Sequence, residues 1–304
     1  MARAIFTTRI DPTYNDLPEQ RYQFPRTYLR QVEAARHDWV IYYEPRRSSG
    51  DLSSRGGRQC YFATARVADI VPDPMQPDHF YALMDSDSYL DFVRPVPFRE
   101  GYRYYESAIQ REDGQTNKGA FGRAVRSLPD REYDAILQAA FAPLLGEGEV
   151  AGPRPPTPLH GMAESPPTFE RPIIERVVAR PFRDAAFSGS IKAAYADTCG
   201  FTSLKIINGG GRSEVQAAHI RPVAAAGPDS LRNGIALCGT VHWMFDRGLI
   251  SIADNHELLL AKGKVPAQVV RMLNPDRRLL APQRADQAPH PLFLRWHRDN
   301  VFKG

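Results

Sequence analysis

A proline-rich segment divides this chain of 304 residues. Residues 143–170 contain seven prolines and four glycines and show neither helical nor strand periodicity. Because proline fixes φ and removes a backbone donor, a segment of this composition is typical of an extended linker. We therefore predict two domains, at 1–142 and 171–304, joined by a flexible linker at 143–170. Each domain is long enough to bury a core of its own.

The composition excludes several classes of protein. The chain is 42% hydrophobic and 24% charged, as globular proteins are. No apolar run reaches the ~20 residues that a membrane span requires, and the N-terminal residues lack the apolar segment of a signal peptide. Cys60, Cys199 and Cys238 form no CxxC pair, so we expect a cytoplasmic protein without a disulfide framework or a four-cysteine zinc knuckle.

The net charge of +4 is unevenly distributed along the chain. Residues 1–142 carry 19 basic and 20 acidic side chains, whereas residues 143–304 carry 20 basic and 15 acidic ones. A basic excess attracts polyanions such as DNA. This excess is too small to identify a partner, so the functional interpretation depends on motifs.

Short aromatic and β-branched segments indicate a mixed sheet in the first domain. Two further segments have the apolar periodicity of helices. The sequence therefore predicts an α+β fold with a curled sheet or barrel and a few helices. The expected strands are 38–44, 59–71, 79–84 and 91–98, and the expected helices are 25–36 and 130–141.

The second domain shows a different order of elements. A helical pattern over 185–200 ends at Gly200, a hairpin is expected over 249–261, and a helix is expected around 267–273. Between the first helix and the hairpin, an apolar strand over 214–220 is followed by a turn and a short helix. These elements frame the residues on which the functional interpretation depends.

Four polar residues follow one another at informative spacings from the end of that strand. Asn233 comes fourteen residues after His219. His242 comes nine residues later, and Asp246 four residues after that. A neutral histidine suits a general base near pH 7. Two donors four residues apart on a helix lie on one face and can bind one divalent cation such as Mg, Mn, Ni or Zn. An asparagine in the returning arm can accept a hydrogen bond or ligate the ion through its amide oxygen.

Each residue of this set also has a simpler interpretation. His219 in an apolar strand can be a core residue, and Asn233 before a glycine can form a turn. His242 and Asp246 can be a pair on a helix surface. The ordered set, with a strand before it and a short helix after it, favours phosphodiester hydrolysis, which needs an activated water and stabilisation of the developing charge.

The segments AAHIRP, LRNGIALC and HWMFDRGLISI resemble the HNH domains of bacterial restriction endonucleases. The resemblance covers the second domain and implies a C-terminal ββα-metal HNH nuclease with one divalent ion in its site. It implies that His219 is the catalytic base and that Asn233 orients it or assists the ion. It also implies that His242 and Asp246 hold the ion. Ala218 departs from the family pattern, because many HNH enzymes have Asp or His there as a metal ligand.

The segments RYQFPRTYL, DWVIYYEPRR, YFATARVADIVPDP and NKGAFGRAVR resemble EVE-type PUA-like domains that are fused to HNH nucleases. This resemblance covers about 10–142 and implies a domain that binds DNA with a modified cytosine and accepts the flipped base in an aromatic pocket. Neighbouring strand residues point to opposite faces, so Tyr42 and Tyr43 cannot both line it. The same aromatic residues can also be core residues. The candidates for the pocket wall are Tyr22, Phe24, Trp39, Tyr42 and Tyr43.

A loop rich in glycine, serine and arginine follows the strand at 38–44. Its arginines can contact the DNA backbone or fill the gap left by a flipped base, or they can belong to a solvated loop. The candidates for backbone contact are Arg46, Arg47, Arg55 and Arg58.

Together, the two resemblances imply a type IV-like restriction endonuclease of phage defence. It would read 5-methyl- or 5-hydroxymethylcytosine in double-stranded DNA by base flipping and hydrolyse phosphodiester bonds nearby. Because one HNH site cuts one strand, a double-strand break would need a homodimer or two molecules. Two alternatives remain open: an HNH nuclease or nickase indifferent to modification, and a non-catalytic reader with a decayed nuclease.

Overall fold

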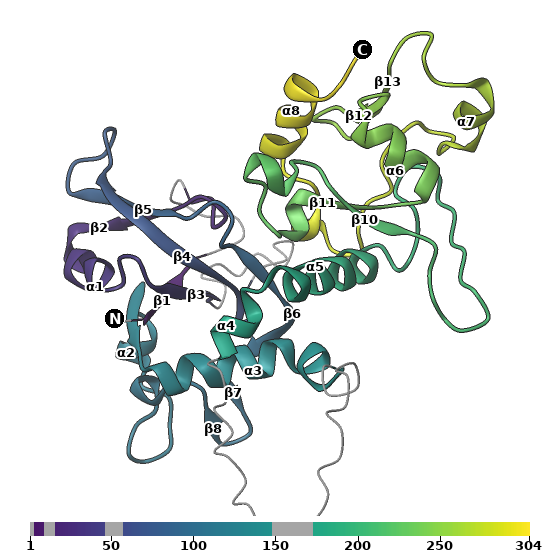
Figure 1. Ribbon diagram of the computed structural model, residues 1–304. Coiled ribbons are helices and arrows are strands. Elements are labelled where there is room, and N and C mark those ends of the chain that lie inside the picture. The colour runs from purple at the N-terminus through teal and green to yellow at the C-terminus, as the bar shows by residue number, and fades with distance from the viewer. Residues whose placement is uncertain (1–2, 9–15, 46–56, 148–172) are drawn as a thin grey trace, which may run out of the picture.

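The computed structural model of the chain describes residues 3–8, 16–45, 57–147 and 173–304 (Figure 1). A broad sheet with helices forms the N-terminal part, and short hairpins with helices form the C-terminal part. This is the mixed α+β architecture that the sequence predicts. Among the described helices, none has the length and apolar character needed to cross a membrane.

A seven-stranded sheet forms the centre of residues 3–147, which correspond to the predicted N-terminal domain. Its strands are β1 (Arg3–Thr7), β2 (Arg21–Pro25), β3 (Trp39–Glu44), β4 (Cys60–Pro72), β5 (His79–Met84), β6 (Leu90–Pro97) and β9 (Val125–Leu128). The order is β2-β5-β4-β3-β1-β9, and β6 pairs with β4. β1 and β3 are parallel, and the other pairs are antiparallel.

The long strand β4 holds this sheet together. It pairs with β3, β5 and β6, and its register shifts between Val67 and Asp69 and between Tyr61 and Ala63. The four predicted strands are confirmed. The predicted barrel is not observed: β2 and β9 end the strand order, and no pairing between them is found in the described chain. Closure of a barrel requires its edge strands to pair, so the sheet is open.

Helices cover the two faces of the sheet. Helix α1 (Leu29–Ala34) contributes Val32 to one buried cluster, and α3 (Asp130–Glu147) contributes Ile136 to the other. Successive strand residues alternate between these clusters, because strand side chains alternate between faces. The remaining short elements are α2 (Lys118–Phe121), β7 (Arg99–Glu100) and β8 (Arg103–Tyr104).

Helix α3 is longer than the predicted 130–141. It contains Pro143 and continues to Glu147, so the predicted linker at 143–170 begins too early. Leu144 and Leu145 pack against the core beneath the helix, and this apolar contact offsets the backbone donor that proline lacks. Residues 148–170 of the predicted linker lie outside the described residues.

In the C-terminal domain, helices and a second short hairpin lie around a two-stranded hairpin. Its elements are α4 (Ile173–Val177), α5 (Arg180–Ala194), β10 (Gln216–His219), β11 (Gly234–Leu237), α6 (Gly239–Asp246), β12 (Ile250–Ile252), β13 (Leu258–Leu260), α7 (Ala267–Met272) and α8 (Pro291–Asn300). The predicted hairpin at 249–261 and the helix near 267–273 are confirmed.

The predicted helix at 185–200 is displaced toward the N-terminus. Helix α5 starts at Arg180, with proline in its first turn, and ends at Ala194, so Gly200 is not its cap. A Cβ added at Gly200 would lie 2.9 Å from Leu279 Cδ1 and 3.1 Å from Ile235 Cγ2. Glycine is needed there because the chain packs closely, not because a helix ends.

Helix α5 lies between the two domains (Figure 1). Val177 and Ala186 belong to the same buried cluster as Phe141 of α3. The rings of Phe141 and Phe182 meet edge to face, with their centroids 5.4 Å apart. The domains are therefore in direct apolar contact, whatever the path of the chain between 148 and 172.

Candidate nuclease site

The hairpin β10–β11 and helix α6 form the frame of the site. His219, the last residue of β10, pairs with Gly234, the first residue of β11. A Cβ at Gly234 would lie 2.3 Å from Ile191 Cδ1 and 2.7 Å from Phe187 Cζ. Position 234 therefore accepts only glycine while α5 packs this closely on the hairpin. The frame is the strand, turn and short helix that the sequence predicts.

His219 is fixed on two sides. Its Nε2 lies 2.9 Å from Asp229 Oδ1, and its ring stacks on Phe187 with the centroids 3.8 Å apart. An ionised Asp229 can only accept a hydrogen bond, so the Nε2 of His219 carries the proton. Neutral His219 then presents the lone pair of Nδ1. This is the tautomer that a general base requires if the reacting water approaches Nδ1.

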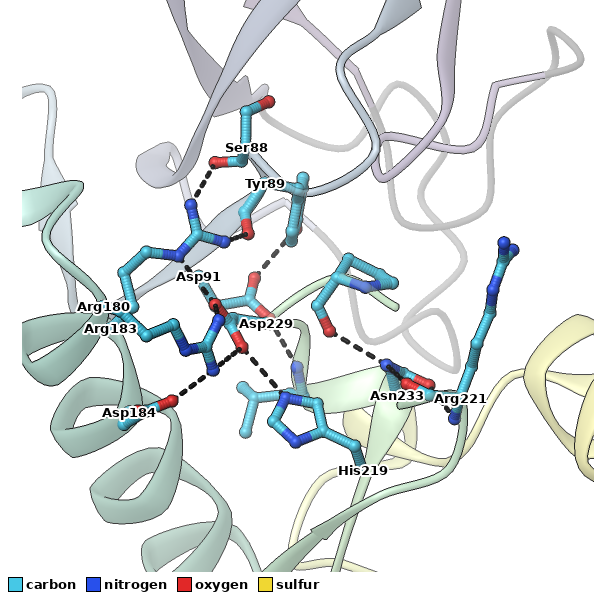
Figure 2. A network of polar contacts seen from close by, with 12 residues as sticks. Ser88, Tyr89, Asp91, Arg180, Arg183, Asp184, His219, Arg221, Asp229 and Asn233 are labelled. Atoms are coloured by element: carbon cyan, nitrogen blue, oxygen red, sulfur yellow. Dashed lines mark hydrogen bonds and ion pairs between the residues drawn. The ribbon is translucent and has the colours of Figure 1, made fainter. Parts of the chain in front are cut away.

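Asp229 is ionised despite its burial. Burial raises the pKa of this carboxyl, but the hydrogen bond with His219 and the charge of Arg183 reverse that effect and lower the pKa to about 2. The guanidinium of Arg180 lowers the pKa further. Figure 2 shows the carboxylate of Asp229 between these three partners.

Asn233 holds the loop that connects β10 to β11. Its side chain is completely buried. Its Oδ1 accepts from the Arg221 backbone N–H at 2.9 Å, and its Nδ2 donates to the carbonyl oxygens of Arg221 and Pro228 at 3.0 and 2.9 Å. The structure thus places the amide in hydrogen bonds with the backbone of the loop that follows His219.

His242 and Asp246 form a second, more exposed part of the site. The His242 Nε2 and Asp246 Oδ2 atoms lie 3.4 Å apart on α6. Two ligands about 2.1 Å from a tetrahedral ion are separated by about this distance. The Nδ1 of His242 lies 2.8 Å from Gln216 Oε1, which accepts its proton and leaves the Nε2 lone pair for an ion. Metal-bound histidines use their second nitrogen in this way.

The candidate ion-binding set is small. Ala218 lies on the same face of β10 as Gln216, because strand side chains alternate, and its methyl group supplies no ligand. Within the described ranges, no cluster of three or more His, Cys, Asp or Glu side chains could hold an ion. His242 and Asp246 therefore fit an ion that takes its other ligands from water or from a substrate phosphate.

The predicted pocket wall is divided between two cores. Tyr22, Phe24 and Tyr42 are at most 2% exposed in one buried cluster. Tyr43 lies in the cluster on the other face, with half-buried Trp39 packed against it. The alternation of Tyr42 and Tyr43 is as predicted, but the structure does not bring the five aromatic residues to one pocket.

A cavity of about 240 Å³ lies where the two domains meet. Its lining includes the aromatic rings of Phe62, Tyr89 and Phe92 and the carboxylates of Glu19 and Asp91. Tyr89 donates its hydroxyl proton to Asp91 Oδ1 at 2.8 Å, and burial raises the pKa of Asp91 to about 6. The cavity thus combines flat apolar surfaces with hydrogen-bond acceptors.

Arg58 also lies at this boundary. It pairs with buried Glu44 and lies 4.0 Å from Asp286 of the C-terminal domain. Arg58 is half-buried and therefore does not belong to a solvated loop, and its contact with DNA stays a prediction. The other three candidates for DNA backbone contact, Arg46, Arg47 and Arg55, lie outside the described residues.

Sequence reasoning missed two residues that contact the predicted set. Asp229 lies in the segment GPDS, four residues before Asn233, and Gln216 lies three residues before His219. Their proximity to the motif is the only signal that the sequence offers. A carboxylate in a turn is more commonly exposed, so the burial of Asp229 against His219 could not be inferred without the contacts that the N-terminal domain makes with this loop.

Residues 188–253 match the family model described as HNH endonuclease. No curated protein matches the chain. Among solved structures, the modification-dependent TagI restriction endonuclease is similar with 15% identity and a TM-score of 0.33, over 98% of this chain and 81% of that one. The type IV phosphorothioation-dependent restriction endonuclease ScoMcrA has 12% identity and a TM-score of 0.19, over 80% of this chain and 46% of that one. Such TM-scores do not establish a shared fold. The chain contains an HNH endonuclease domain.

Proposed function

We propose that the chain is a metal-dependent DNA endonuclease whose N-terminal domain directs it to DNA with modified cytosine. The observation that carries the proposal is the HNH frame with His219 oriented by a buried carboxylate. A decayed nuclease would not need to keep His219, Asn233, His242 and Asp246 in these positions. The family match over 188–253 supports the nuclease part.

The reaction follows from the position of His219. Its Nδ1 takes a proton from a water molecule, and the oxygen of that water attacks the phosphorus. The bond between phosphorus and the 3′ oxygen breaks, and the 3′ oxygen takes a proton from water and leaves as a hydroxyl. The products are the 5′-phosphate ends that the HNH resemblance implies. Asp229 stabilises the imidazolium that forms, because its carboxylate is already ionised and accepts the hydrogen bond from His219 Nε2. A divalent ion held by His242 and Asp246 would stabilise the charge that develops on the phosphate.

The interdomain cavity is the better candidate for a base pocket. A flipped base needs aromatic faces and polar groups at its edge, and the cavity offers Phe62 and Tyr89 with Glu19 and Asp91. A carboxylate can accept the hydrogen bond of a cytosine amino group. Tyr22, Phe24 and Tyr42 of the predicted wall are buried and do not line this cavity.

Digestion of matched plasmids tests the function. Plain, 5-methylcytosine and 5-hydroxymethylcytosine plasmids are each incubated with the protein and Mg, Mn, Ni or Zn. We expect cutting of modified plasmids only, and none by His219→Ala. Equal cutting of all three would contradict the reader function, and no cutting under any condition would contradict the nuclease.

Sedimentation of the DNA-bound protein tests the proposed homodimer. One bound copy of the protein on DNA that is cut in both strands would exclude it.

Substitution of the cavity aromatics tests the pocket. Phe62→Ala should reduce binding of modified DNA by roughly tenfold, because stacking of one base is worth about 1–3 kcal/mol. Tyr102→Ala is the control, since Tyr102 is an aromatic residue of the same domain with 98% exposure. If Trp39→Ala weakens modified-DNA binding and Phe62→Ala does not, the predicted wall is the pocket.

A further inference from the structure

We propose that Asp229 is a positioning residue for His219 and that the N-terminal domain, through Ser88–Asp91, holds Asp229 in place. The nuclease base is then aligned only while the two domains are docked as observed. The inference rests on the proposed nuclease function. It adds a physical connection between the domain that would read DNA and the residue that would cut it.

The first step is the confinement of His219. The ring lies between Asp229 on its Nε2 edge and Phe187 on its face, with an interplanar angle of 11° to Phe187. A stacked ring with one nitrogen bonded cannot rotate without losing both contacts. Removal of the Asp229 charge would therefore free both the orientation and the tautomer of the imidazole.

The second step is the confinement of Asp229. Its Oδ2 accepts from Arg183 Nε at 2.7 Å and from Arg180 Nη1 at 3.1 Å. Its Oδ1 accepts from Arg180 Nη2 at 3.1 Å as well as from His219. The side chain is fully buried, so ionisation without these cations would cost several kcal/mol. The low pKa of Asp229 agrees with this arrangement.

The third step leads into the N-terminal domain. Arg183 donates through Nη1 to the Ser88 carbonyl oxygen at 3.2 Å and through Nη2 to the Tyr89 carbonyl oxygen at 2.9 Å (Figure 2). Three nitrogen donors of Arg183 are therefore engaged: two bind carbonyl oxygens of the N-terminal domain and one binds Asp229. Because the guanidinium is planar, movement of Ser88 and Tyr89 would rotate the Nε–H that binds Asp229.

Two further hydrogen bonds hold the backbone beside Asp229. Asp91 Oδ2 accepts from the Leu231 N–H at 2.7 Å. Ser230 Oγ donates to Glu19 Oε1 at 2.9 Å. Both acceptors belong to the N-terminal domain and both donors to the loop after Asp229. The position of this loop is thus set by contacts across the domain boundary.

The same residues line the interdomain cavity. Tyr89, Asp91 and Leu231 contribute to its wall. An occupant of the cavity would contact the residues that hold Asp229 and would stabilise the docked arrangement. Binding in the cavity and alignment of His219 are therefore coupled through shared side chains.

The test uses the full chain and two readouts. The first is kcat and KM for cleavage of modified plasmid, and the second is the ¹⁵N chemical shifts of the His219 ring, which report its tautomer. For Asp229→Asn we expect kcat to fall about 100-fold with KM unchanged, within the usual contribution of a general base. We also expect the Nε2–H tautomer of His219 to give way to a mixture.

A variant in the other domain tests the interdomain step. Asp91→Ala removes the acceptor for Leu231 N–H without touching His219. We expect kcat to fall about tenfold and the His219 tautomer to shift in the same direction, as for sites coupled by a shared element. Asp113→Ala is the matched control, because Asp113 is an exposed acidic residue of the same domain that pairs with Arg111 and does not line the cavity. It should leave both readouts unchanged.

The outcomes separate the inference from the proposed function. An unchanged His219 tautomer in Asp229→Asn would overturn the positioning role, whether or not cleavage is lost. An unchanged tautomer and kcat in Asp91→Ala would overturn the interdomain role. If the parent cuts no DNA but the tautomer shifts in both variants, the positioning is upheld and the nuclease function fails.

Discussion

The two parts of the nuclease site differ in how firmly the protein holds them. His219 is 18% exposed and contacts a fully buried carboxylate that two arginines also bind. Asp246, in contrast, is 54% exposed, and within the described residues its pair with His242 is supported by the hydrogen bond between His242 and Gln216. The proposed base is held by contacts with residues of both domains, whereas the proposed ion-binding pair lies on one short helix. A group that must be aligned for proton transfer needs such rigidity, while an ion can complete its own coordination with water.

The largest expected effect comes from the rigid part. His219→Ala should lower the single-turnover cleavage rate by about 100- to 10,000-fold, because it removes the general base. Ion affinity, measured by calorimetry with Mn, should stay unchanged, and excess ion should not restore the rate. Restoration of cleavage by excess ion would show that His219 belongs to the ion-binding part instead.

The effect of a substitution in the pair formed by His242 and Asp246 should depend on the ion concentration. His242→Ala should weaken ion affinity by more than tenfold, because it removes one of two protein ligands. Cleavage should recover at high ion concentration if the remaining ligands suffice to bind the ion. The distinction between the two parts of the site fails if His242→Ala leaves ion affinity unchanged while cleavage disappears.

The pH dependence of the free energy of unfolding tests the part of the site that contains Asp229. The pKa of Asp229 is lowered from its usual range to about 2, so its ionised form stabilises the fold above about pH 4, and that stabilisation is lost as the pH falls toward 2. It amounts to about 2 kcal/mol, since one pKa unit corresponds to about 1.4 kcal/mol. The free energy of unfolding of the parent should therefore fall more steeply between pH 4 and 2 than that of Asp229→Asn. Parallel curves would contradict the burial of an ionised Asp229.

The smallest effect is expected for substitution of Gln216, which accepts a hydrogen bond from His242. Gln216→Ala removes the acceptor for His242 Nδ1–H, and ion affinity should fall roughly tenfold, as for other groups that orient a metal-binding histidine. Isothermal titration with Mn measures this. Gln216→Glu, which keeps an acceptor, should retain the parent affinity, and a loss in that variant would indicate a different role for the side chain.

Local patterns predicted the parts that depend on local structure. The strands β3 to β6 were predicted because aromatic and β-branched residues are concentrated in them. His219, Asn233, His242 and Asp246 were recognised because a hairpin and a helix keep them within a short stretch of chain. Their spacing is fixed by the covalent geometry of that unit, so one sequence suffices to suggest it.

Contacts between distant segments could not be predicted in this way. The bond from Arg183 to Ser88 joins residues 95 positions apart, and nothing in the local pattern around either residue indicates it. The open sheet and the extension of α3 past Pro143 have the same origin, because both depend on packing partners elsewhere in the chain. Tyr22, Phe24, Tyr42 and Tyr43 are buried in the core for the same reason, whereas Trp39 is half-buried.

Helix α5 sets a limit on exchanging the nuclease between proteins. The family match begins at residue 188, inside a helix that starts at Arg180. A graft cut at that position would divide the helix and remove Arg183 and Phe187, which hold Asp229 and His219. The transferable unit must begin before Arg180, and its new neighbour must offer two carbonyl oxygens where Ser88 and Tyr89 now lie.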